Sequence, residues 1–199
     1  MNEIILIEDR PGRQRQFLTD KQFGMLCEKS YLNMPQEEIC RTLIDEINSN
    51  NTSSLLRYSL VMIHRSSLDR NGLKAIDDLC NVQKIDLILF SGGLSQLIYA
   101  REKYQSLSLN SKEFYNNHLI SFLDKYSQEK TTSLLELVYH SNWKLELLMR
   151  YRLLKTKEMF EEDEFVQVIL EEEIKLIEKI TGISSDSINS EINKIITTL

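Results

Sequence analysis

Three short apolar runs, each ending abruptly at polar residues, constrain the fold of this chain more than any other feature. The runs are Ile4–Ile7, Leu60–Ile63 and Ile85–Phe90, and only Asp86 interrupts the last. Continuous apolar runs of this length are typical of strands that are buried on both faces of a parallel sheet. A segment with helical periodicity follows each run, so the sequence predicts an α/β fold with a doubly wound parallel sheet.

Weaker patterns predict the remaining elements of the first 126 residues. The Asn-Met-Pro-Gln stretch at 33–36 predicts a helix start, and residues 23–32 could hold another strand. A helix is predicted over residues 93–104, followed by an edge strand at 106–109. Asn110 stands three residues before a glutamate, which is a capping-box spacing and predicts a helix to about residue 126.

The last third of the chain has only helical patterns. A long helix broken near residues 140–142 and a second helix over about Glu161–Ile180 are predicted, with a third near the C-terminus. The apolar face of the third helix would consist of Ile188, Ile192, Ile195, Ile196 and Leu199. Three helices of this size bury a marginal core alone. We therefore expect an α/β domain at residues 1–126 and a helical extension at 128–199 that packs on that domain, on a second copy or on a partner protein.

Charge and composition exclude several classes of partner. Residues 128–199 carry 9 Lys and Arg against 14 Asp and Glu, so phosphate backbones repel them and nucleic acid is not an expected partner. No apolar run approaches the roughly 18 residues of a membrane span, and the N-terminus lacks signal-peptide features. The three cysteines have no CxxC spacing and predict reduced thiols. We expect a cytoplasmic protein that does not bind membranes.

Polar residues that could act chemically follow each of the three apolar runs. Functional groups of an open parallel sheet gather just beyond the carboxyl ends of its strands. The sequence places Glu8 and Asp9, then His64, then Ser91 at three such ends. These four residues are the candidate site.

The segments around these strand ends resemble a two-component receiver domain. The stretch ILIEDRPGRQRQFL has the family's apolar strand, acidic pair and following helix with a basic residue. The stretch LVMIHRSSLDRNGL fits the family's third strand and loop, with Gly72 and Leu73 at the usual offset from the phospho-acceptor. The resemblance covers roughly residues 1–126 and implies a five-stranded, flavodoxin-like sheet.

The match to the receiver site is incomplete. A receiver carries a phospho-accepting Asp after strand three, a Ser or Thr after strand four and a Lys after strand five. In this chain His64 occupies the acceptor's place, and Ser91 fits the Ser/Thr position. Asn110 or Ser111 falls where the Lys should be, and Lys112 is the nearest candidate. The resemblance is therefore to a pseudo-receiver.

These departures have a chemical consequence. Phosphoryl transfer to a receiver needs a carboxylate nucleophile and a metal held by several oxygens, and an imidazole is a poor replacement for both. We expect a degenerate site without a resident cofactor, in a chain that is not an enzyme. The implied function is phosphorylation-independent signalling or adaptor activity through protein–protein contacts, with residues 128–199 binding a protein partner or forming a homodimer.

The acidic pair allows two interpretations, and the sequence also allows a catalytic alternative. Glu8 and Asp9 could bind a divalent cation such as Mg²⁺, or they could cap the helix that follows them. Alternatively, the chain is a small hydrolase in which His64 activates Ser91 and an acidic residue orients the imidazole. Ser91 does not stand in a G-x-S-x-G elbow, which argues against that alternative.

A third alternative is a sensor of a phosphorylated small molecule. The Ser91-Gly92-Gly93 turn resembles a small anion-binding loop at a helix N-terminus. Arg65, at the end of the neighbouring strand, would strengthen such a site. Two glycines without a G-x-G-x-x-G or Walker pattern are a weak motif, because a tight turn explains them equally well.

Overall fold

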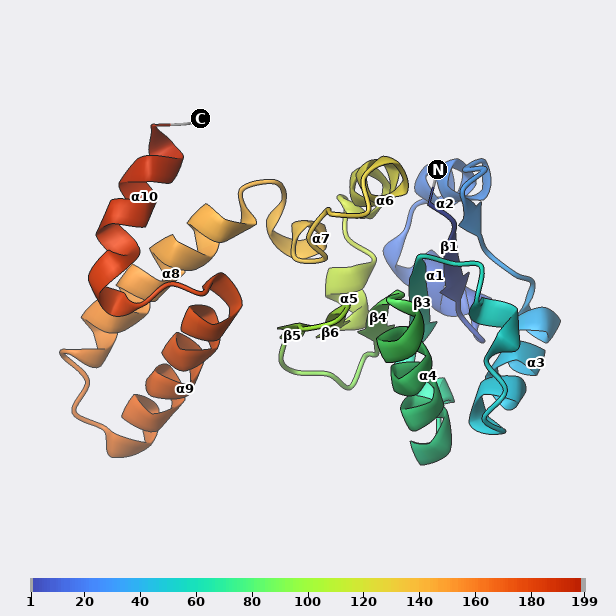
Figure 1. The fold of residues 1–199 in the computed structure, drawn as a ribbon, viewed down its shortest axis with the longest axis horizontal. Coiled ribbons are helices and arrows are strands. Elements are labelled where there is room, and N and C mark those ends of the chain that lie inside the picture. Colours follow the sequence, from blue (N-terminus) through green and yellow to red (C-terminus); the bar gives the residue numbers. More distant parts are fainter. Residues whose placement is uncertain (1, 198–199) are drawn as a thin grey trace. The chain divides into compact units, whose positions relative to one another are not determined.

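The computed structural model describes residues 2–197 and divides the chain into two compact units, residues 1–140 and 141–199 (Figure 1). Leu199, predicted on the apolar face of the last helix, lies outside the described residues. The division falls later than the expected boundary at 126–128. The reason is that the segment after residue 130 bonds to the sheet: Gln105 donates from Nε2 to the carbonyl of Thr132 (3.0 Å) and accepts from the backbone N–H of Leu134 (3.1 Å).

The first unit is built on a six-stranded sheet in the order β2-β1-β3-β4-β6-β5. Its strands are β1 (Ile4–Ile7), β2 (Leu32–Asn33), β3 (Leu60–His64), β4 (Asp86–Phe90), β5 (Ile98–Arg101) and β6 (Gln105–Leu109). All neighbouring pairs are parallel except β5 and β6, which are antiparallel. Every residue of β1 and β3 is buried. The predicted α/β class with a mostly parallel sheet is confirmed.

The segment after β4 differs from the prediction. The helix expected over residues 93–104 is wrong, because Ile98–Arg101 forms β5 instead. Ile98 and Tyr99 point to opposite faces, with Ile98 56% exposed and Tyr99 6% exposed, as neighbouring residues of a strand do. Consequently β6 is not an edge strand, and the sheet has six strands rather than five. The expected strand at 23–32 is also largely helical, since α2 (Asp20–Cys27) covers most of it and β2 begins only at Leu32.

Helices cover both faces of the sheet, as Figure 1 shows. They are α1 (Pro11–Phe17), α2, α3 (Glu37–Asn48), α4 (Arg70–Gln83), α5 (Ser111–Phe114), α6 (Leu119–Gln128) and α7 (Glu136–Tyr139), with short 3-10 helices η1 (Ser53–Leu55) and η2 (Arg65–Ser67). On one face, α3 and α4 pack on β1, β3 and β4 through a shared apolar cluster. On the opposite face Phe90 of β4 stacks on Phe114 of α5, with ring centroids 4.1 Å apart.

A buried polar network crosses the first unit at Asp86. Its carboxylate accepts from the backbone N–H of Gln105 (2.7 Å) and from the Tyr126 hydroxyl (2.9 Å), while burial raises the pKa of this acid. Strands β4 and β6 and helix α6 are therefore joined at a single carboxylate. The cysteines are unbridged: Cys40 and Cys80 are buried and Cys27 is exposed.

The second unit is helical, as predicted. It consists of α8 (Trp143–Glu158), α9 (Glu164–Thr181), the 3-10 turn η3 (Ser185–Ser187) and α10 (Ile188–Ile196). Its small core contains Leu147, Leu148, Tyr151, Leu154, Leu170, Ile174, Ile177, Ile188 and Ile192. Gly182 ends α9 with φ +67°, a conformation that glycine adopts at little cost. Over residues 2–197, no helix has both the length and the apolar character that a membrane span requires.

Candidate functional site

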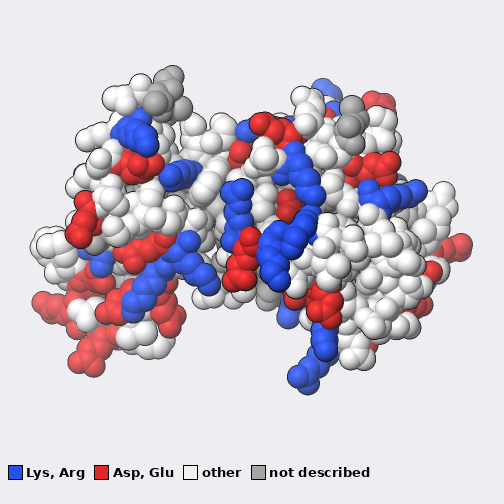
Figure 2. Space-filling model, in the orientation of Figure 1, with Lys and Arg blue, Asp and Glu red and all other residues white. Residues whose placement is uncertain are grey.

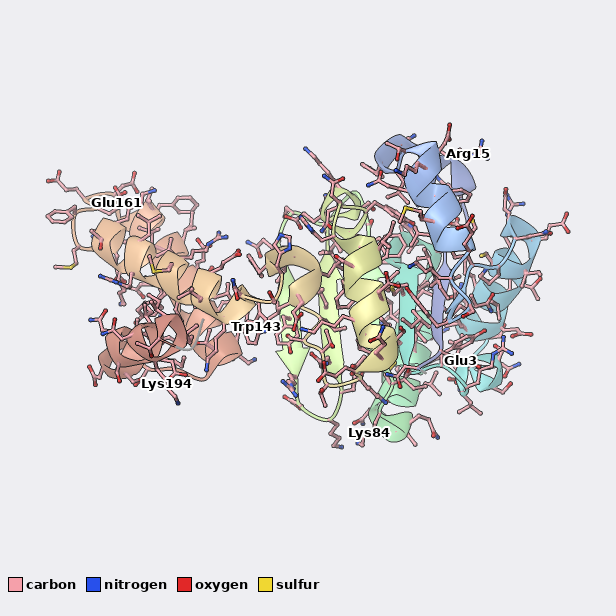
Figure 3. All side chains as sticks on the ribbon, turned by 90° about the horizontal axis from the view of Figure 1, so that it is seen from above. Glu3, Arg15, Lys84, Trp143, Glu161 and Lys194 are labelled. Carbon is pink, nitrogen blue, oxygen red and sulfur yellow. The ribbon has the colours of Figure 1, made fainter. Side chains whose placement is uncertain are left out.

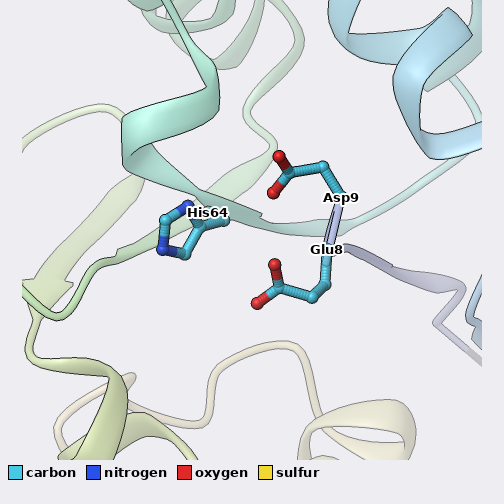
Figure 4. Close-up of side chains that lie close together, drawn as sticks. All are labelled: Glu8, Asp9 and His64. Carbon is cyan, nitrogen blue, oxygen red and sulfur yellow. The ribbon is translucent and has the colours of Figure 1, made fainter. Parts of the chain in front are cut away.

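The sheet brings the acidic pair and the histidine together. Strands β1 and β3 are parallel neighbours with Ile7 opposite Ile63, so the residues that follow each of these lie side by side. Figure 4 shows the carboxylates of Glu8 and Asp9 directed toward the imidazole of His64. Ligand atoms of these three side chains all lie within 4.8 Å of one another. Three of the four predicted site residues therefore meet at one point.

Arg13 on α1 completes this group. Its Nη1 lies 2.8 Å from Nδ1 and 2.6 Å from Nε2 of His64, within hydrogen-bond distance of both. The same nitrogen lies 3.7 Å from Oε1 of Glu8 and 3.9 Å from Oδ1 of Asp9. Because α1 begins directly after the acidic pair, Arg13 stands one helical turn beyond Asp9 and reaches back over the strand ends. The guanidinium thus neutralises the acidic pair from within the chain.

The turn η2 holds the other side of the site. Ser67 donates from Oγ to Oδ1 of Asp9 (2.9 Å), and Ser66 Oγ lies 2.9 Å from Nδ1 of His64. Asn48 of α3 fixes this turn, since its amide donates to the carbonyl of Ser67 (3.3 Å) and its oxygen accepts from the backbone N–H of Asp69 (3.0 Å). Each polar atom of the cluster accordingly meets a partner supplied by the fold.

Burial sets the ionisation of two groups in this site. Glu8 is 4% exposed, and this desolvation raises its pKa to about 7. A hydrogen bond from the backbone N–H of Arg10 to Oε1 of Glu8 (3.1 Å) acts in the opposite direction and lowers the pKa. His64 is 3% exposed, and burial followed by the nearby charge of Arg13 lowers its pKa to about 4. At neutral pH His64 is therefore an uncharged ring beside a guanidinium.

The pKa values of Asp9 and Tyr115 are also shifted by their surroundings. Burial alone would raise the pKa of Asp9, but hydrogen bonds, chiefly from Ser67, hold it below its ordinary value of 3.8. The Tyr115 hydroxyl donates to Oε2 of Glu8 (3.3 Å), and burial raises the pKa of this phenol well above its ordinary range. Asp9 is thus the permanent anion of the site, and Arg13 is its permanent cation.

These residues do not fit the Mg²⁺ site of a receiver. Mg²⁺ prefers oxygen ligands in near-octahedral geometry, whereas the donor set of Glu8, Asp9 and His64 includes an imidazole, which suits transition metals better. Arg13 lies against all three donors, so a divalent cation would have to displace its guanidinium. Cation binding by this cluster is therefore in competition with a side chain of the protein itself.

The structure does not pair Ser91 with His64. Ser91 follows Phe90, which lies opposite His64 in the sheet, yet its Oγ accepts from the backbone N–H of Gly93 (3.4 Å). No hydrogen bond joins Ser91 to His64 in the described part of the chain, and the imidazole faces Arg13 and Ser66 instead. This geometry does not support the Ser-His hydrolase alternative.

The predicted anion loop lacks its helix. Gly92 and Gly93 lie in an exposed turn that leads to β5, so the helix N-terminus on which that site depended is not there. Arg65 is exposed on η2. Asn110, one of the residues expected in place of a receiver's lysine, caps α5. Ser111, the other, is buried with no hydrogen-bond partner for its Oγ among the described residues. Lys112 is exposed and forms no ion pair within residues 2–197.

Arg13, Ser67 and Tyr115 are site residues that were not predicted from the sequence. The spacing of Arg13 from Asp9 was a usable signal, because residues four apart at a helix start lie on one side. Tyr115 gave no such signal, because it lies more than 100 positions from Glu8 along the chain. Comparison of the chain with family models, with curated proteins and with solved structures found no match in any of the three.

Proposed function

We propose that this protein is a phosphorylation-independent signalling or adaptor protein, made of a degenerate receiver-like unit and a helical unit that contacts other proteins. The parallel strands of the first unit follow the order β2-β1-β3-β4-β6, which supports a flavodoxin-like winding with β5 as an added edge strand. In such a fold the candidate site occupies the position at which ligands bind, beyond the carboxyl ends of the strands.

The observation that carries the proposal is the contact of Arg13 with His64 and the acidic pair. A phospho-accepting site needs a carboxylate nucleophile and a bound cation that attracts the incoming phosphoryl group. Here a neutral imidazole stands at the acceptor's position, and a guanidinium already balances the acidic pair. The site is therefore suited to hold one conformation of the surrounding loops rather than to react.

One experiment tests the absence of phosphorylation. The full-length chain is incubated with acetyl phosphate and Mg²⁺, and the intact mass is measured under mildly alkaline conditions that preserve acyl and imidazole phosphates. We expect no phosphorylated species. An unrelated receiver with an intact acceptor Asp serves as the positive control, and phosphate on Asp9 or His64 would overturn the proposal.

A second experiment tests the adaptor role. Full-length protein and a chain ending at His140, where the first compact unit ends, are used to capture proteins from the native host. We expect a specific partner that the full-length chain retains equally with and without acetyl phosphate, and that the shortened chain loses. Release of the partner by acetyl phosphate would contradict phosphorylation independence, and capture of nothing above background would contradict the adaptor role.

A further inference from the structure

The outer face of α8 carries an apolar stripe that the second unit does not bury. Met149, Leu153 and Phe160 are 49%, 68% and 79% exposed, and they recur at four- and seven-residue intervals along α8 and the turn after it. At 100° per residue this spacing places them on one side, opposite the side that holds the core residues Leu148 and Tyr151. Exposed large apolar side chains in a row mark an interaction surface.

Helix α9 has a second exposed apolar row. Phe165, Val168 and Ile169 are 75%, 54% and 48% exposed, while Leu170 and Ile174 on another side of the same helix enter the core. The two rows lie on consecutive helices that pack on each other. We call these six residues the α8–α9 surface: Met149, Leu153, Phe160, Phe165, Val168 and Ile169.

The two helices differ in charge. Helix α8 carries five Lys and Arg against two Glu, whereas α9 carries two Lys against five Glu. Figure 2 shows acidic side chains gathered around the end of this unit at which α9 begins, and Figure 3 labels Glu161 there, at the end opposite Trp143. One pair, Arg150 with Glu173, already joins the helices within the chain.

Other charges beside the α8–α9 surface have no such pairing. Arg152 and Lys157 on α8 are exposed, as are Glu164 and Glu172 on α9, and none of the four forms an ion pair within residues 2–197. Lys157 stands one turn from Leu153, and Glu172 stands one turn from Val168. An apolar row with basic neighbours therefore lies beside an apolar row with acidic neighbours.

We infer that the α8–α9 surface docks on the same surface of a second copy of this chain, with α8 of each copy against α9 of the other. A two-fold interface is self-complementary, so both basic-to-acidic contacts form at once and the four helices make a bundle. Helices of 16 and 18 residues present a face about 25 Å by 20 Å, which is the scale of one side of a small stable interface.

Charge complementarity favours this occupant over others. An anionic membrane or a nucleic acid would be attracted to α8 but repelled by α9. The inference rests on the proposed function for the role of this contact in signalling. It extends that function by naming a second copy of the chain as a partner of the helical unit.

Sedimentation velocity of the full-length chain over a range of concentrations tests the inference. We expect the wild type to approach twice the 23.4 kDa chain mass. Leu153→Glu and Phe165→Glu should each raise the dimer dissociation constant by at least about tenfold, because a charge placed in an apolar contact must be desolvated. Val82→Glu is the matched control: Val82 is 70% exposed on α4, and this change should leave the mass unchanged.

Charge reversal tests the α8-to-α9 arrangement itself. An acidic chain (Arg152→Glu, Lys157→Glu) and a basic chain (Glu164→Lys, Glu172→Lys) should each be monomeric alone at low salt, because like charges then oppose each other. Mixed together, they should form a heterodimer, since the acidic α8 of one copy then meets the basic α9 of the other. Circular dichroism checks that all variants keep their helices.

Each unfavourable outcome has a distinct meaning. A wild type that is monomeric at every concentration overturns the inference, and if it still captures a host protein the proposed function stands. If Leu153→Glu and Phe165→Glu leave the dimer intact, or if Val82→Glu also dissociates it, the α8–α9 surface is not the interface. Failure of the mixed chains to pair overturns the reciprocal arrangement.

Discussion

The guanidinium of Arg13 lies within 2.8 Å of both ring nitrogens of His64 and within 4 Å of carboxylate oxygens of Glu8 and Asp9. A single cation thus contacts both carboxylates and the imidazole that the sheet gathers at the ends of β1 and β3. Because the charge balance is internal, the loops after these strands need no ligand to stay in place.

Removing the internal cation should open the site to metal. We expect Arg13→Ala to bind Mn²⁺ at least about tenfold more tightly than the wild type, because two carboxylates and an imidazole lose a positive neighbour. Isothermal titration calorimetry measures the affinities. Arg15→Ala is the matched control, because Arg15 is exposed on the same helix and contacts none of the three donors. Equal affinities in wild type and Arg13→Ala would contradict the competition between Arg13 and a divalent cation.

The shifted pKa values of Glu8 and His64 should have opposite effects on the pH dependence of the free energy of unfolding. Glu8 is raised from 4.5 to about 7, so its stabilising contribution is complete below pH 4.5 and is lost as pH rises toward 7. His64 is lowered from 6.5 to about 4, so its contribution is complete above pH 6.5 and is lost as pH falls toward 4. Each shift corresponds to about 3 kcal/mol, and the two effects partly cancel between pH 4.5 and 6.5.

Single substitutions should reveal each effect separately. In Glu8→Gln the free energy of unfolding should fall as pH falls from 6.5 to 4, and in His64→Asn it should fall as pH rises from 4.5 to 7. Urea denaturation at a series of pH values measures both slopes. Asp86, whose pKa burial also raises, contributes equally to all chains and cancels in the comparison. Variants with the same pH dependence as the wild type would show that neither group is linked to folding.

The Asp86 network should contribute strongly to stability. Tyr126→Phe removes a hydroxyl whose oxygen lies 2.9 Å from the buried Asp86 carboxylate and 3.0 Å from the carbonyl of Ser59, and we expect a loss of about 1.5–3 kcal/mol. Tyr104→Phe is the matched control, since its hydroxyl donates to Asp77 at the surface and should cost less than about 1 kcal/mol. Chemical denaturation of both variants gives the difference. Equal losses would mean that burial does not strengthen the Asp86 contacts.

Gly72 should tolerate no side chain. A Cβ at this position would lie 2.1 Å from Oδ1 of Asn48, the residue that holds η2 beside the site, so Gly72→Ala should destabilise the protein by about 1–3 kcal/mol. Gly24→Ala, in α2 with open space around the added methyl, should instead stabilise by about 0.5–1 kcal/mol. Thermal denaturation distinguishes the two signs. A neutral Gly72→Ala would mean that Asn48 moves aside without cost.

The parallel part of the sheet was predictable because its signal is local. Runs such as Ile4–Ile7 and Leu60–Ile63 are apolar throughout, and only strands covered on both faces require that pattern. The error at residues 93–104 arose because the apolar residues there fit a helix as well as a strand. Pairing with β6 decided in favour of β5, and that pairing is a contact between two segments rather than a property of either one.

The candidate site was also predictable in part from local sequence. Glu8, Asp9, His64 and Ser91 each follow an apolar run, and parallel strands necessarily end at one edge of the sheet. The sequence did not reveal that Ser91 bonds within its own turn, because the direction of a side chain depends on the loop after the strand. Nor did it reveal Tyr115, whose approach to Glu8 depends on how α5 packs on the sheet.

The sequence by itself determined the α/β class, the helical C-terminal unit and the presence of a histidine rather than a carboxylate after the strand Leu60–His64, because residue identity and periodicity decide these. Only the tertiary structure decided the sixth strand, the end of the first unit at residue 140 and the place of Arg13 against His64. The physical reason is that these depend on contacts between distant segments. The burial that shifts the pKa values of Glu8 and His64 likewise exists only once the chain has folded around them.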